Sequence, residues 1–242
     1  DVRVRLAPDL PPLVFKRLSG EVAVGNDDLT ASLTYRDLAF TLADGLNWPA
    51  SSGRLAWQHA PWPRGWPASG WGDNQGGEAQ ADRLDLAQLA LLADRLPLAA
   101  RTRDALSDLA PRGVIEALSW RWEGAASEPL RYQLKARVRG LGLSESREAG
   151  QGRPGLAGAD VTVQATETGG SAELAVREGW LGFPGVFEEP RIPLDSLSAS
   201  VRWTVQPPAQ PGKPSRWQVE VRQARFANAE AAGQLEGTWR TG

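Results

Sequence analysis

Period-two alternation of apolar and polar residues runs through most of this 242-residue chain. The clearest case is the stretch 131–139, in which Tyr132, Leu134, Ala136 and Val138 alternate with arginine, glutamine and lysine. Successive side chains of a β-strand point to opposite faces of the sheet, so this pattern is typical of strands with one apolar and one wet face. Similar stretches, separated by turn residues, predict about ten strands that pair antiparallel with their neighbours in the chain.

One region follows a helical period instead. Leu84, Leu89, Leu92 and Leu96 recur at helical spacing, and Pro97 ends the run. A second short helix is predicted over 102–110. We therefore expect a mainly β (β-rich α+β) fold with one short helical hairpin near 84–110. The chain is interpreted as a single segment, 1–242, of a larger protein, with a first strand meander at 1–80, the hairpin at 81–112 and a second strand meander at 113–242.

Two local features interrupt the strands. The parity of the apolar positions changes after Tyr35, which predicts a β-bulge or tight bend near 36–37. The stretches 49–77 and 144–158 are rich in glycine, proline and serine, so both are predicted to be loops.

Composition excludes several functional classes. Lysine and arginine total 27 against 29 acidic residues, and this balance gives no basic surface for nucleic acid. The chain has no cysteine and a single histidine, His59, so we expect no metal site and no cofactor. The best remaining carboxylate pair is Glu188–Glu189, but adjacent strand residues point to opposite faces and do not converge on one bond. The prediction is that the protein is not an enzyme.

Five tryptophans gather in one proline- and glycine-rich span: Trp48, Trp57, Trp62, Trp66 and Trp71. Such rings stack on sugars, sit at membrane interfaces, or pack a loop against its own domain. The packing interpretation is the simplest. The first interpretation leads to an alternative function, a noncatalytic structural or glycan-binding β module that uses this Trp-rich loop.

The apolar strand faces need a cover. Burying one large apolar side chain contributes roughly 1.5–3 kcal/mol, and two short helices shield only part of such a sheet. Either a second sheet closes a sandwich, or the sheet curls into a trough whose lining is covered by an apolar ligand such as an acyl chain. The alternation alone leaves both possibilities open.

Three stretches, 109–122, 183–197 and 219–239, resemble the YhdP family of AsmA-like envelope proteins. The resemblance implies a long curled antiparallel sheet that forms an open, taco-like groove. It also implies that phospholipid acyl chains move along this groove between the inner and outer membranes, supporting the outer-membrane barrier. The full-length protein would lie in the periplasm, tethered to the inner membrane by one helix, and this chain would be an internal fragment of it.

The resemblance transfers no single site residue, so the groove candidates are apolar strand positions. Their expected partners are phospholipid acyl chains and, through the rest of the full-length protein, the two membranes. No nucleic acid is expected. Each candidate would offer the acyl tails a nonpolar path, and ordinary core packing is the alternative for each: Leu33, Tyr35, Phe40, Leu118, Trp120, Leu134, Val138, Val201, Trp203, Val219 and Val221.

Overall fold

The computed structural model describes residues 2–27, 29–58, 75–96, 98, 100–126, 128–146, 153–185, 189–207 and 215–241. Strands make up 69% of the structure and helices 10%, and the sheet does not close into a barrel. This confirms the mainly β prediction. The chain falls into two compact units, Asp1–Tyr132 and Gln133–Gly242, which we call the N-unit and the C-unit.

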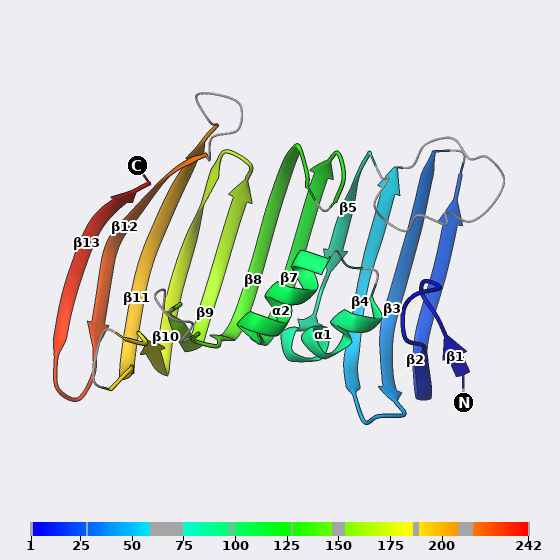
Figure 1. The fold of residues 1–242 in the computed structure, drawn as a ribbon, viewed down its shortest axis with the longest axis horizontal. Helices are drawn as coiled ribbons and strands as arrows, with labels where there is room; N and C mark the ends of the chain where they lie inside the picture. Colours follow the sequence, from blue (N-terminus) through cyan, green and yellow to red (C-terminus); the bar gives the residue numbers. More distant parts are fainter. Residues whose placement is uncertain are drawn as a thin grey trace. The chain divides into compact units, whose positions relative to one another are not determined.

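The N-unit holds an open antiparallel sheet, coloured from blue to green in Figure 1. Its strands pair in the order β1-β2-β3-β4-β5-β7, and β6 pairs separately with β7. The bounds are β1 (Val2–Val4), β2 (Leu13–Asn26), β3 (Thr30–Leu42), β4 (Asn47–Gln58), β5 (Gly76–Ala81), β6 (Leu84–Asp85) and β7 (Arg112–Glu123).

The predicted bulge in the first meander is confirmed. Tyr35 pairs with Gly53, but Leu38 pairs with Ser51, so β3 has one more residue than β4 at this point. Asp37 takes up the extra length with a φ of 49°. The bulge keeps Tyr35 and Leu38 on the same face of the sheet although their sequence parity differs.

The helical hairpin is also confirmed, as α1 (Leu86–Leu92), the 3-10 helix η2 (Ala93–Arg95) and α2 (Ala100–Leu109). Asp85 begins α1 by accepting a hydrogen bond from the Gln88 backbone N–H at 3.0 Å, which satisfies one free donor of the first turn. Leu92 is buried in a cluster with Leu42 and Trp48. The helical segment therefore packs on the apolar side of the N-unit sheet (Figure 1).

The C-unit is a second run of antiparallel strands, each paired with its neighbours in the chain. Its small buried cluster is formed by Ala159, Val176 and Leu194. The bounds are β8 (Arg131–Leu143), β9 (Gly155–Thr166), β10 (Gly169–Gly182), β11 (Arg191–Gln206), β12 (Arg216–Ala227) and β13 (Ala232–Arg240).

The described residues form thirteen strands, more than the ten or so that the alternation predicts. The prediction that 49–77 is a loop is wrong for 49–58, which belongs to β4, and for the start of β5 at Gly76. Likewise, β9 begins at Gly155 inside the predicted loop 144–158. Backbone pairing with long neighbouring strands holds these glycine- and serine-rich segments in the sheet despite their weak intrinsic preference for it.

Candidate functional site

One face of the N-unit sheet carries continuous rows of apolar residues. Strand register puts Val24, Leu33, Leu55, Ala79 and Trp120 side by side across five strands. The neighbouring row contains Val22, Tyr35, Gly53, Ala81 and Leu118. Four of the predicted groove residues therefore share one face: Leu33, Tyr35, Leu118 and Trp120.

Phe40 lies on the same face, at the end of the sheet that the helical segment covers. Its ring stacks on Trp48 at a centroid distance of 5.7 Å and meets Phe15 edge-on at 5.4 Å. It also packs against the cluster that contains Leu92 of α1. The structure thus places Phe40 in the core beneath the helical segment, where it packs against protein.

Away from the helical segment, the apolar face of β2 is open. Leu18, Val22 and Val24 are 50%, 56% and 66% exposed. They face the same way as Phe40, Tyr35 and Leu33, their register partners on β3. The sequence pattern does not indicate these β2 positions, because register shifts after Phe15 and after Ser19 break the alternation along the strand.

Tyr35 places a phenol on this face of the N-unit. Partial burial raises the pKa of its phenol, and the nearby Asp82 carboxylate raises it further, while a hydrogen bond with Ser51 acts in the opposite direction. The phenol therefore stays neutral at physiological pH, so it adds no charge to the apolar rows.

The C-unit repeats the arrangement. One row runs through Leu134, Ala165, Gly170, Trp203, Val219 and Trp239, and the next through Ala136, Val163, Ala172, Val201, Val221 and Gly237. Val138 lies in a third row with Val161 and Leu174. All six groove residues predicted in this half of the chain therefore share one face.

This face stays open toward the last strand. Trp239 and Leu235 on β13 are 60% and 61% exposed, and Trp217 and Phe226 on β12 are also exposed. The described strands of the C-unit belong to one sheet that does not close into a barrel, and the exposure of these residues shows that no described strand covers them. The closed-sandwich alternative is therefore wrong for the described part of this unit.

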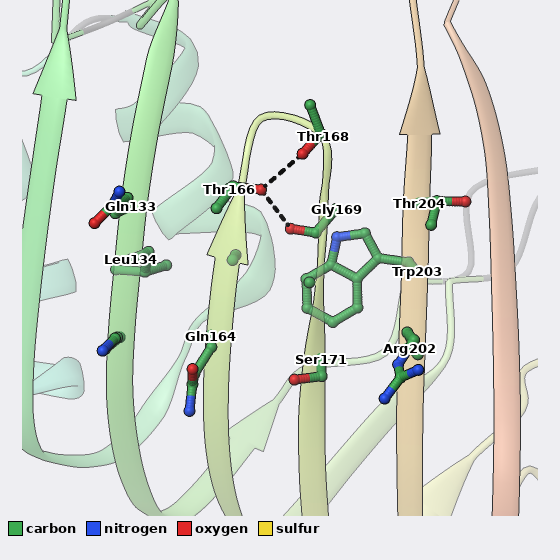
Figure 2. A pocket seen from close by; sticks show the side chains of 13 residues that line it. Gln133, Leu134, Gln164, Thr166, Thr168, Gly169, Ser171, Arg202, Trp203 and Thr204 are labelled. Atoms are coloured by element: carbon green, nitrogen blue, oxygen red, sulfur yellow. Dashed lines mark hydrogen bonds between the residues drawn. The ribbon is translucent and has the colours of Figure 1, made fainter.

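A pocket of about 440 Å³ lies at the end of β8–β11 (Figure 2). Four members of the apolar row line it together with polar residues: Leu134, Ala165, Gly170 and Trp203. Its polar lining residues include Gln133, Lys135, Gln164, Ser171 and Arg202, whose side chains alternate with the apolar row. The Thr166 hydroxyl also lies there and donates to the Gly169 carbonyl at 3.1 Å.

The Trp-rich span is divided by the fold. Trp48 is buried, and its Nε1 donates to the Ser51 hydroxyl at 3.0 Å. Trp57 lies in β4, paired with Gly77. These two rings belong to the sheet, whereas Trp62, Trp66 and Trp71 lie outside the described residues, as do His59 and Glu188.

The described ranges hold neither a metal-binding cluster nor a membrane-spanning helix. Within them, histidine, aspartate and glutamate nowhere form a group of three or more able to hold a metal ion. Among the helices that the structure describes, none has the length and apolar character needed to cross a membrane.

Comparison with known proteins identifies the family. The family model described as YhdP protein matches residues 1–241, which is nearly the whole chain. The chain belongs to the YhdP family. This confirms the resemblance seen in the sequence and assigns the protein to the AsmA-like envelope proteins. No curated protein and no solved structure matches the chain.

In this YhdP-family chain the candidate site is the apolar sheet face itself. It offers a surface of aliphatic and aromatic side chains on each unit, partly covered by the helical segment in the N-unit and open along β2, β12 and β13. Such a surface binds by contact area and not through individual polar groups.

Proposed function

We propose that this chain is a segment of a periplasm-spanning protein that conducts phospholipids between the inner and outer membranes. In this proposal the acyl chains lie on the apolar sheet faces, and the segment acts without catalysis. The observation that carries the proposal is the exposure of large apolar side chains on the apolar face of each unit, at Val22 and Val24 in the N-unit and at Leu235 and Trp239 in the C-unit. Membership in a family of envelope proteins supports it.

Solvation energy supports an apolar occupant. Each methylene group removed from water contributes about 0.8 kcal/mol, so an acyl chain lying on a row of valine, leucine and tryptophan gains several kcal/mol. The same contact shields the protein's own exposed side chains. A charged headgroup gains nothing on this face and would stay at its margin, in water.

The wider setting is part of the proposal. The full-length protein would be tethered to the inner membrane, and this segment would contribute one stretch of the lipid path in the periplasm. Lipids passing along it would reach the outer membrane and maintain its barrier.

Two adjacent residues of β11 test the proposal. Val201 lies in an apolar row, whereas the side chain of the next residue, Arg202, points to the opposite face of the strand. The chain is expressed in cells with a photoactivatable amino acid at Val201 and is irradiated while the cell membranes are still present. This amino acid should cross-link to phospholipid, and mass spectrometry identifies the lipid adduct. The same amino acid at Arg202 should give little lipid adduct, because it faces water.

Equal adduct yields at the two positions would contradict the proposal, since lipid would then bind without regard to the face. So would the absence of phospholipid adducts at Val201 in a chain that circular dichroism shows to be folded.

A further inference from the structure

In four cross-strand pairs among the described residues, an aromatic side chain on the apolar face covers the glycine opposite it on the neighbouring strand. Two of the pairs belong to the N-unit and two to the C-unit. They are Tyr35 with Gly53, Trp122 with Gly77, Trp203 with Gly170, and Phe226 with Gly233.

The ring in each pair occupies the space that a side chain on the glycine would fill. A Cβ built on Gly170 would lie 2.5 Å from Cζ2 of Trp203, and one built on Gly77 would lie 2.5 Å from Cζ2 of Trp122. Side chains of a strand ordinarily stand roughly perpendicular to the sheet. Here the indole leans over the neighbouring strand, and Figure 2 shows the Trp203 ring extending from β11 across β10.

Backbone conformation does not explain these two glycines. Gly77 and Gly170 are absent from the residues of positive φ, so an L-residue can adopt their backbone angles. The adjacent glycines Gly76 and Gly169 do have positive φ. What constrains Gly77 and Gly170 is space, because a Cβ on either would meet both the covering ring and a carbonyl oxygen of the other neighbouring strand, that of Ala56 at 2.5 Å or of Gln164 at 2.4 Å. A ring that covers a sheet glycine is an arrangement known to stabilise it.

A ring that lies on the sheet adds little height to the apolar face. In the row that contains Trp203, the residues between it and Leu134 are Ala165 and Gly170, which are both small. The row is therefore low across β9 and β10. A side chain at Gly170 would push the indole away from the sheet and over this low strip.

We propose that Gly170 is a positioning residue for the acyl-chain path, because its missing side chain lets Trp203 lie flat and keeps the strip between Leu134 and Trp203 free for an extended chain. Gly77 has the same role beneath Trp122 in the N-unit. The inference rests on the proposed function and adds to it the residues that set the height of the lipid-bearing surface.

The test places a photoactivatable amino acid at Leu134 and exposes the purified chain to vesicles of dipalmitoyl phosphatidylglycerol. Gly170→Ala should lower the lipid adduct about fourfold, the factor that follows from losing the contact of one methylene group. Gly237→Ala is the matched control, because Gly237 lies on the same face opposite Val221 and has open space above it. Its adduct yield should equal that of the wild type.

A double variant separates the ring from the backbone. A Cβ on Gly170 would also crowd the Gln164 carbonyl oxygen, so Gly170→Ala alone can distort the sheet. If the displaced ring is the obstacle, Trp203→Val in the Gly170→Ala background should restore the adduct to the wild-type yield.

An undiminished adduct in Gly170→Ala would overturn the inference while leaving the proposed function intact. Failure of Trp203→Val to restore the adduct would also overturn it, because the loss would then come from the sheet. A folded wild-type chain without adducts at either Leu134 or Val201 would instead overturn the proposed function, and this inference with it.

Discussion

Leu42 and Leu18 are leucines on the same face of neighbouring strands, but only one of them is in the core. Leu42 is 1% exposed and packs in the cluster with Leu92, whereas Leu18 is half exposed. Leu42→Ala should therefore lower the free energy of unfolding by about 2–5 kcal/mol, the range for removing a buried leucine side chain. Leu18→Ala, the same change on an open surface, should cost about 1 kcal/mol or less.

Urea denaturation of the purified variants measures both values. Equal losses for the two variants would show that Leu18 is shielded by the protein to the same degree as Leu42, contrary to the description of an open apolar face.

The odd or even position of a residue in an alternating stretch predicts which face of the sheet its side chain occupies. It does not predict what covers that face. Leu134 and Trp203 belong to unbroken alternating stretches, and the structure places them on one face as expected. Phe40 has equally suitable parity but lies beneath α1, because contacts distant in sequence decide its surroundings. The pairing of Trp203 with Gly170 is also invisible in the sequence, since it depends on strand register.

At the scale of elements, one ion pair joins the helical segment to the turn between β3 and β4. The Arg95 guanidinium of η2 donates to the Asp44 carboxylate, which also accepts from the Leu46 backbone N–H. These contacts lower the pKa of Asp44, with the Arg95 hydrogen bond as the largest cause. A carboxylate with a lowered pKa stabilises the fold above its unfolded-state pKa, and the contribution disappears as pH falls through the folded-state pKa.

Asp44→Asn should accordingly lower the Tm at pH 7, and the difference from the wild type should shrink as the pH falls below about 4. The effect should be small because the pair is partly exposed. Asp94→Asn, which removes an exposed acid of the same 3-10 helix, serves as the control and should leave the Tm nearly unchanged. Thermal melts across this pH range measure both variants. A Tm difference for Asp44→Asn that is independent of pH would contradict this account of the pair.

The helices and strands agree with the sequence pattern where one spacing of apolar residues continues unbroken. They differ from it where bulges or small residues interrupt that spacing. The 131–139 stretch became β8, and the leucine spacing near 84–96 became α1 and η2. In contrast, β2 contains two register shifts and β4 contains Pro49, Ser51, Ser52 and Gly53, so neither shows a clean period. Cross-strand hydrogen bonding, a nonlocal interaction, keeps both in the sheet.

At the scale of the whole molecule, the central claim is that the apolar faces are a surface for acyl chains. It rests on family membership and on large apolar residues that the described strands and helices leave exposed. Sequence alternation predicted these faces, but it left open whether a second sheet would close over them. The single-layer pairing within each unit removes that alternative for the described strands.

The most direct test is native mass spectrometry of the chain purified gently from cells, followed by identification of any released lipid. The account predicts that phospholipid co-purifies with the folded chain and is released when the chain unfolds. A folded chain that repeatedly carries no phospholipid, even after incubation with phospholipid vesicles, would contradict it.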